Sequence, residues 1–329
     1  MQMKSKVTVS APGKLMLFGE HAVVYGHPCI VTAVDQRMFV TAEITNTGNF
    51  ELEAPDVKIT SYKKAISEIG QGEMPKGAQF VEAAVKNILK KYKRNLTGLS
   101  VTTRSEFSSQ FGFGSSSAST VCMVKALTEL LSLKLTNKEI FDIAFKTVLD
   151  IQGKGSGFDV AAGVYGGTLY FVTPGKKIEK LNIKNLPLIV GYSGVKADTV
   201  TLINKVSDTA KDYPRVIDGI YDIVGIIVNE AKPYVVKENF EELGRLMNLN
   251  QGLLESMGVS IDKLSQMIYA ARDNGAYGAK LSGAGGGDCI IALAPAKNIS
   301  IIGKAIQRVG GTIIKVKANA EGVRVEKNK

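Results

Sequence analysis

The sequence has no tryptophan and very little histidine or cysteine among its 329 residues. His21 and His27 are its two histidines, and the three cysteines, Cys29, Cys122 and Cys289, lie far apart in apolar surroundings. Zinc sites and disulfide frameworks need several such residues at short spacings. The pattern therefore argues against both and predicts three buried thiols.

Long uncharged apolar runs are also missing. No stretch approaches the roughly 20 apolar residues that a membrane-spanning helix needs. The apolar segment 217–228 is interrupted by Asp218 and Asp222, which favours a packed helix. The opening segment MQMKSKVTVSAPGK lacks the apolar centre of a signal peptide. We expect a cytoplasmic protein without a membrane partner.

The charge is basic, with 41 lysines and arginines against 31 aspartates and glutamates. These charges are scattered, and no aromatic and basic ribbon or recognition-helix pattern accompanies them. We therefore expect no nucleic-acid partner. A basic surface that attracts small anionic molecules explains the excess more simply.

Residues 111–119 read FGFGSSSAS and are followed by apolar residues at helical spacing. Gly112 and Gly114 thus fall where a loop becomes a helix N-terminus, whose free N–H groups bind anions. Three hydroxyls, on Ser115, Ser116 and Ser117, can add donors to phosphate or ligate magnesium. The alternative is an ordinary serine N-cap after a flexible turn.

A second glycine run, KLSGAGGGDC, covers residues 280–289. Four glycines within five positions indicate a backbone that passes close to a ligand or to another loop. A tight strand connection is the alternative interpretation. Neither run contains a Walker A motif or a complete dinucleotide-binding fingerprint.

Residues 11–26 read APGKLMLFGEHAVVYG. Pro12 and Gly13 are expected to break the first strand, and Lys14 supplies an ammonium group suited to a phosphate or carboxylate. Glu20 and His21 follow an apolar run. An isolated histidine of this kind is more often a structural hydrogen-bonding residue than a ligand.

Asp159 stands in the glycine-rich and otherwise apolar segment 152–167. Alone, it is most simply a turn residue. Beside phosphate-binding loops, it can instead orient a hydroxyl group and accept its proton during phosphoryl transfer.

Together these segments resemble the three motifs of the GHMP family of small-molecule kinases, in the family's order and over nearly the whole chain. The resemblance implies magnesium-assisted transfer of the ATP γ-phosphoryl group to a substrate hydroxyl. It implies Asp159 as the base, Lys14 as its charge-stabilising partner, and Ser116 as a ligand of magnesium or phosphate. The implied ATP-phosphate contacts are Gly112, Gly114, Ser115, Ser116 and Ser117.

Within the family, Glu20, His21, Thr199 and the segment 246–271 are similar to the mevalonate kinases. This resemblance implies phosphorylation of the 5-hydroxyl of mevalonate. The residues that it places around the substrate are Glu20, His21, Thr199, Gly283, Ala284 and Gly285.

Other features depart from the mevalonate kinases. Segment 153–162 and Asp288 are more similar to the phosphomevalonate kinases, so phosphorylation of 5-phosphomevalonate is the alternative. Val148 stands where mevalonate kinases carry a magnesium-binding glutamate. Asp150 is two residues further along a helix and is expected to point to another face. A catalytically silent sensor is disfavoured because Lys14, Ser116 and Asp159 are all present.

The periodicities predict an α+β protein. Strands are expected at residues 6–10, 37–45, 99–104, 168–172, 187–191, 288–294 and 312–317, and helices at 79–92, 117–131, 137–150, 240–256 and 261–274. The polar segment 173–185 suggests two domains, 1–175 and 176–329. The family resemblance implies a ribosomal-protein-S5-like first domain and a ferredoxin-like second domain, with the active site in the cleft between them. Oligomeric state stays open, with a homodimer as the default expectation.

Overall fold

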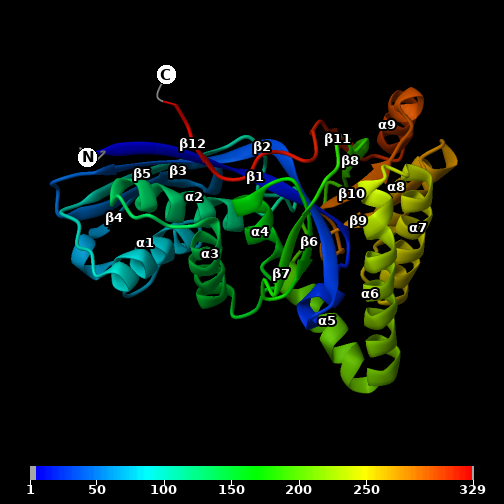
Figure 1. Ribbon diagram of the computed structural model, residues 1–329, viewed down its shortest axis with the longest axis horizontal. Helices are drawn as coiled ribbons and strands as arrows, with labels where there is room; N and C mark the ends of the chain where they lie inside the picture. The colour runs from blue at the N-terminus through cyan, green and yellow to red at the C-terminus, as the bar shows by residue number, and fades with distance from the viewer. Residues whose placement is uncertain (1–4, 328–329) are drawn as a thin grey trace.

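The computed structural model describes residues 5–327 and contains two β-sheets flanked by helices (Figure 1). The first sheet has 8 strands in the order β12-β1-β2-β5-β3-β4, with β6 paired to β2 and β7 paired to β6. Their bounds are β1 Lys6–Phe18, β2 Pro28–Ile44, β3 Asn49–Ala54, β4 Ile59–Ala65, β5 Leu99–Ser105, β6 Thr168–Val172, β7 Lys177–Leu181 and β12 Arg324–Val325.

Four helices accompany the first sheet: α1 Gln79–Tyr92, α2 Ser115–Leu130, α3 Asn137–Gln152 and α4 Phe158–Tyr165. Of these, α2 packs directly on β1 and β2, and α1 and α3 pack on α2. The buried face of α2 includes Val121, Val124 and Leu127, which keep the helical spacing seen in the sequence. This packing fixes the N-terminus of α2, where the serine run begins.

The second sheet has 4 antiparallel strands in the order β11-β8-β10-β9. Its strands are β8 Leu188–Tyr192, β9 Gly278–Ser282, β10 Cys289–Leu293 and β11 Thr312–Ile314. Numbered along the chain, the order is 4-1-3-2, with helices before the second and fourth strands. This is a ferredoxin-like arrangement, as the resemblance implied.

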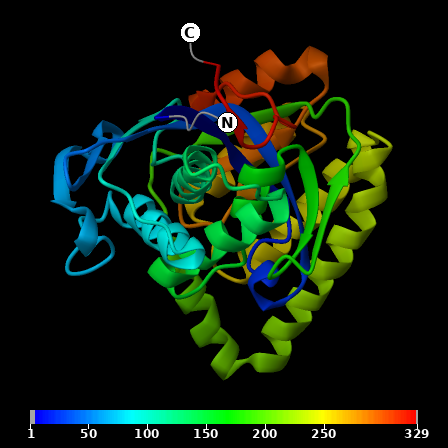
Figure 2. The same cartoon turned by 60° about the vertical axis from the view of Figure 1, so that its left-hand side comes forward.

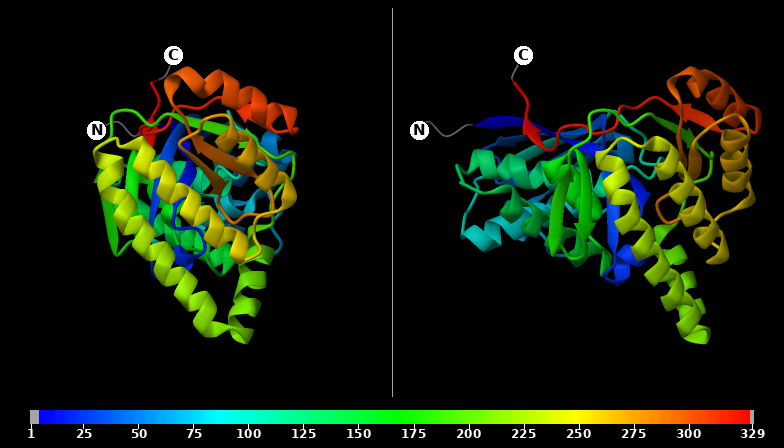
Figure 3. Two further views of the ribbon diagram at one scale, coloured as in Figure 1. Left: turned by 90° about the vertical axis from the view of Figure 1, so that its right-hand side faces the viewer. Right: turned by 45° about the vertical axis from the view of Figure 1, so that its right-hand side comes forward.

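Five helices belong to the second half: α5 Thr199–Asp212, α6 Pro214–Val236, α7 Phe240–Ser256, α8 Asp262–Asp273 and α9 Ile299–Arg308. The α5–α6 pair projects from the molecule as a V-shaped hairpin (Figures 1 and 2). Helices α6 and α7 pack side by side (Figure 3). In the described part of the chain, no helix is both long and apolar enough to span a membrane.

The first strand runs through the Pro12–Gly13 pair, so the prediction that these residues end it is wrong. β1 pairs with β2 on both sides of a register shift between Pro12 and Gly13. A bulge of this kind tolerates proline because the ladder hydrogen bonds are already interrupted there. The second half of β1 thereby carries Lys14 toward the second sheet and places Glu20 just beyond the strand.

The expected boundary at residue 175 falls inside the first sheet, because β7 pairs with β6 up to Leu181. The chain enters the second sheet at Leu188. It then returns to the first sheet through residues 315–327, which we call the C-terminal strap. The polar segment 173–185 therefore contains the turn of the β6–β7 hairpin and also leads to the crossing between the two sheets.

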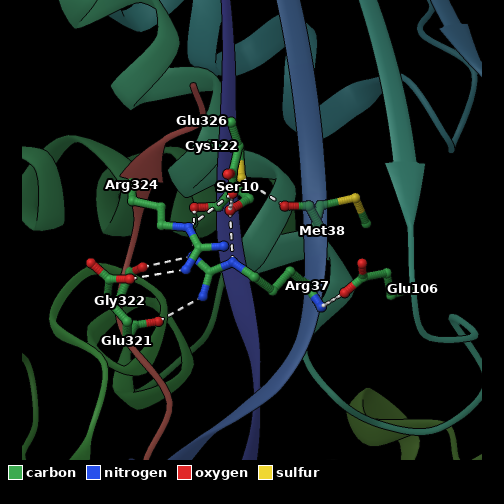
Figure 4. A network of polar contacts seen from close by, with 9 residues as sticks. All are labelled: Ser10, Arg37, Met38, Glu106, Cys122, Glu321, Gly322, Arg324 and Glu326. Carbon is green, nitrogen blue, oxygen red and sulfur yellow. Dashed lines mark hydrogen bonds and ion pairs between the residues drawn. The ribbon is translucent and has the colours of Figure 1, made fainter. Parts of the chain in front are cut away.

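The C-terminal strap is held by the buried side chain of Arg37 (Figure 4). The guanidinium group donates to the carbonyl oxygens of Glu321 at 2.8 Å and Gly322 at 2.7 Å. It also donates to the hydroxyl and carbonyl oxygens of Ser10 at 2.6 and 3.0 Å. Ser10 in turn donates its hydroxyl to Glu326.

Two hydrophobic clusters form the interior, and β10 contributes to both. Cys289, Ile291 and Leu293 belong to the larger cluster, which also contains the buried residues of β1 and β2. Ile290 and Ala292 point into the smaller cluster, formed largely within the second half. This alternation follows from the two-residue period of a strand. All three cysteines are buried and free, as predicted.

Candidate active site

A cavity of about 510 Å³ is lined by residues of both halves of the chain. The lining residues that were expected at a site from the sequence are Lys14, Glu20, His21, Gly112, Gly114, Ser115, Ser116, Ser117, Asp159, Thr199, Gly283 and Ala284. Residues separated by more than 250 positions therefore meet in one cleft. Gly285 is the expected site residue that does not line this cavity.

The serine run forms the first turn of α2, which begins two residues before the helix start predicted from the sequence. Gly114 is the N-cap of this helix and has a φ of 78°, and Gly112 has a φ of 72°. Glycine is required at these angles because other residues adopt them at a steric cost. The free N–H groups of the α2 N-terminus are thereby presented at the cavity.

Lys14 connects the first strand to the loop at residues 111–114, which we call the phosphate-type loop. Its Nζ donates to the carbonyl oxygen of Gly112 at 2.7 Å, and its backbone N–H donates to Phe113 at 3.0 Å. A Cβ built at Gly114 would lie 3.3 Å from Lys14 Cε and 3.6 Å from Asp159 Cβ. The loop, the cation and the carboxylate thus converge on one point.

Burial lowers the pKa of the Lys14 ammonium from its usual value, and the nearby carboxylates of Asp159 and Asp288 oppose this shift. Only 8% of Lys14 is exposed. Low exposure strengthens the interaction between the ammonium group and any anion that enters the cavity.

Asp159 is the second residue of α4, in the first turn after the N-cap Gly157. Its Oδ1 accepts a hydrogen bond from the backbone of Val160 at 2.9 Å, and its Oδ2 accepts one from the Ser117 hydroxyl. Ser117 is buried and donates its hydroxyl to Asp159, and its expected contact with phosphate stays a prediction. The sequence offered no signal for this pair, because 42 positions separate the two residues.

Glu20 and His21 contact the glycine-rich segment 280–289. Glu20 forms a buried ion pair with Lys280, and His21 Nε2 is hydrogen bonded to the carbonyl oxygen of Ala284 at 2.8 Å. Burial raises the pKa of the Glu20 carboxyl group, and the Lys280 ammonium opposes this shift. These contacts form part of the cavity wall and attach the first half of the chain to β9 and to the loop after it.

The glycines of segment 280–289 have different surroundings. A Cβ at Gly283 would meet no atom within 4 Å, which is consistent with its place in the cavity wall. A Cβ at Gly285 would lie 2.2 Å from the carbonyl oxygen of Val259. Gly285 is therefore needed for close packing against the chain before α8.

Val148, the departure noted from the mevalonate kinase pattern, lines the cavity. Asp150 lies on another face of α3, where it accepts hydrogen bonds from Lys146 and Asn87. Among residues 5–327, no cluster of three histidine, cysteine or carboxylate side chains could hold a metal. The Ser116 hydroxyl lines the cavity and is an oxygen donor of the kind that magnesium accepts beside phosphate oxygens and water.

Sequence reasoning missed Lys196, which precedes α5 and lines the cavity. Its Nζ lies 3.3 Å from Asp288 Oδ1, and its side chain is 48% exposed. The residue lies three positions before Thr199, which the family resemblance singled out, but no motif pointed to the lysine itself.

The chain is similar to known proteins over most of its length. The chain matches the family models "GHMP kinases N terminal domain" over residues 79–167 and "GHMP kinases C terminal" over residues 231–311. It is 39% identical over 332 residues to the mevalonate kinase of Thermococcus onnurineus, covering 98% of each chain. It is likewise 39% identical over 335 residues to that of Pyrococcus abyssi, covering 98% of this chain and 99% of the relative.

Solved structures agree with this. The Methanococcus jannaschii mevalonate kinase has a TM-score of 0.82 at 26% identity, covering 96% of this chain and 99% of that one. A Streptococcus pneumoniae phosphomevalonate kinase has a TM-score of 0.80 at 18% identity, covering 95% and 99%, and shares the fold alone. Both family models and full-length relatives lead to the same assignment: the chain belongs to the GHMP kinase family.

Proposed function

We propose that the chain is a mevalonate kinase, which transfers the γ-phosphoryl group of ATP to the 5-hydroxyl of mevalonate. The observation that carries the chemistry is the convergence of Lys14, Asp159 and the α2 N-terminus on one cavity. The acceptor is inferred from the curated relatives named mevalonate kinase, which align with nearly the whole chain.

In the proposed mechanism, the ATP phosphates lie against the N-terminus of α2. Gly112 and Gly114 let the backbone approach them, and Ser115 and Ser116 add hydroxyl donors. The carboxylate of Asp159 orients the 5-hydroxyl and accepts its proton, while Lys14 offsets the negative charge around the transferred group.

Ser116 would hold magnesium together with phosphate oxygens. When bound, the ion supplies neutralisation of the phosphate charge. Ser117 acts on the reaction through Asp159, because its hydroxyl fixes the orientation of the carboxylate.

The acceptor is proposed to bind at the end of the cavity formed by Glu20, His21, Thr199, Gly283 and Ala284. Gly285 contributes through the shape of its loop. His21→Ala should raise the KM for mevalonate more than the KM for ATP, because His21 lines the cavity and is hydrogen bonded to Ala284 of the proposed acceptor site. Equal increases in both constants would contradict this placement.

An ADP-release assay with magnesium and ATP tests the function directly. Mevalonate and 5-phosphomevalonate are supplied in parallel, and we expect turnover with mevalonate alone. Turnover with 5-phosphomevalonate alone would contradict the proposal and would support the alternative suggested by Asp288 and by segment 153–162.

Two variants test the catalytic roles. Asp159→Asn and Lys14→Met should each lower kcat by about 100-fold or more, the range typical of lost acid–base or electrostatic catalysis. Circular dichroism should show that both remain folded. Asp142→Asn, which removes a carboxylate from the exposed surface of α3, is the matched control and should keep full activity. The cytoplasmic location, the homodimer and the expected absence of nucleic-acid and membrane partners stay predictions.

A further inference from the structure

Asp288 has an unusual backbone conformation for a residue with a side chain. It is the last residue before β10, it is 7% exposed, and its φ is 55°. The glycines just before it, Gly285, Gly286 and Gly287, also have positive φ, where glycine has no steric cost. An aspartate persists in such a conformation when its surroundings hold it there.

Those surroundings come from one short segment, residues 193–197, between β8 and α5. The backbone of Asp288 accepts a hydrogen bond from Ser193 at 2.9 Å and donates one to Val195 at 2.7 Å. Its Oδ1 accepts from the backbone of Ala197 at 3.0 Å and from Lys196 Nζ at 3.3 Å. Asp288 therefore fixes both the path of this segment and the position of the Lys196 ammonium group.

Lys196 has capacity left for a ligand. An ammonium group has three N–H donors. In the described part of the chain, Asp288 is the one acceptor within hydrogen-bonding distance of Lys196 Nζ. The side chain is half exposed and faces the cavity. Lys14, by contrast, already donates to Gly112 and lies between the phosphate-type loop and Asp159.

The cavity wall next to Lys196 suits a small organic acid better than a nucleotide phosphate. The first turns of α5 contribute the apolar side chains of Val200 and Ile203 together with the polar Thr199 and Asn204. Gly112, Gly114 and the free N–H groups that favour phosphate belong to the α2 side of the cavity. A carboxylate bound at Lys196 would thus leave an apolar carbon chain against α5.

We propose that Lys196 binds the carboxylate of the acid acceptor, and that Asp288 is the positioning residue that holds Lys196 at the cavity. This inference rests on the proposed function, because it names the group that recognises the acceptor in the same site.

Steady-state kinetics with mevalonate and ATP test the role of Lys196. Lys196→Met should raise the KM for mevalonate by about 10-fold or more, the loss expected for one charge-assisted hydrogen bond. The KM for ATP and kcat should change by less than about twofold, and Lys196→Arg should recover most of the affinity. An unchanged KM for mevalonate, or an equal rise in the KM for ATP, would overturn the assignment.

Asp288→Gly tests the positioning role, since glycine accepts the φ of 55° without the carboxylate. Like Lys196→Met, this variant should raise the KM for mevalonate. The double variant Lys196→Met/Asp288→Gly should resemble Lys196→Met, because Asp288 acts through Lys196. Independent, multiplying effects would contradict this. Lys211→Met removes an exposed lysine from the same helix as Thr199 and is the charge-matched control.

The assay separates this inference from the proposed function. Wild-type protein that does not turn over mevalonate contradicts the function. Calorimetric titration of mevalonate into the wild type and Lys196→Met then tests the inference without catalysis. Weaker binding to the variant supports it, whereas equal binding or no binding to either protein overturns it.

Discussion

The buried ion pair between Lys280 and Glu20 offers a direct test of how the two halves of the chain are joined. Both side chains are 0% exposed, and Lys280 Nζ also donates to the carbonyl oxygen of Leu281 at 2.6 Å. Lys280→Met leaves the Glu20 carboxylate buried without its counter-ion. Breaking such a pair on one side typically costs about 3–5 kcal/mol, out of a total stability of about 5–15 kcal/mol.

The loss should depend on pH. Burial raises the pKa of Glu20, and Lys280 limits that rise, so its removal raises the pKa further. Folded Glu20 then keeps its proton at pH values above 4.5, where the unfolded chain has released it. The folded state binds more protons in this window, so its stability falls as the pH rises. The variant should therefore lose more stability at about pH 7 than at about pH 5.

Denaturant unfolding of Lys280→Met, Glu20→Leu and the double variant measures the effect. The double variant should be more stable than Lys280→Met, because replacing both charges removes the unpaired group. Lys138→Met removes an exposed ion pair on α3 and should cost less than about 1 kcal/mol. A similarly small loss in Lys280→Met, or a double variant no more stable than it, would refute the reasoning.

Three further predictions concern the site and the strap. Burial lowers the pKa of Lys14, so in a pH–rate profile the alkaline fall of kcat/KM should begin at a lower pH than for an ordinary lysine. Lys14→Arg should shift this alkaline fall to higher pH, because arginine stays protonated. Gly112→Ala should raise the KM for ATP by about 10-fold, because its φ of 72° is strained for a residue with a Cβ and the loop before α2 would have to shift; an unchanged KM for ATP in initial-rate assays would contradict this. Arg37→Met should lower the free energy of unfolding by about 3 kcal/mol and expose the C-terminal strap to limited proteolysis, since several buried carbonyl groups lose their donor. Protection equal to the wild type would show that the strap is held by its other contacts.

Elements with strong local signals were predicted closely from the sequence. The expected helix at 79–92 and strand at 168–172 match α1 and β6 at both ends. Helix α2 begins two residues before its predicted start, because the serine run itself forms the first turn. The expectation for Asp150 was confirmed as well, since helical geometry alone places it away from the Val148 face.

Features that depend on distant residues were not predictable. Glu20 and Lys280 are 260 positions apart, and no local pattern shows that they pair. The sequence shows that Pro12 has no backbone N–H to donate, which predicts the end of a strand. The bulge that accommodates Pro12 forms only through pairing with β2, which the sequence does not show. Lys196 became recognisable only when the fold brought Asp288 beside it.

The shared packing around β10 has a consequence for how the protein unfolds. Its odd-numbered residues lie in the hydrophobic cluster of the first sheet, and its even-numbered residues lie in the cluster of the second half. Separating the halves would expose one face of this strand to water, at a cost that grows with the apolar area uncovered. The two halves, although they match separate family models, should therefore melt together in a single cooperative transition.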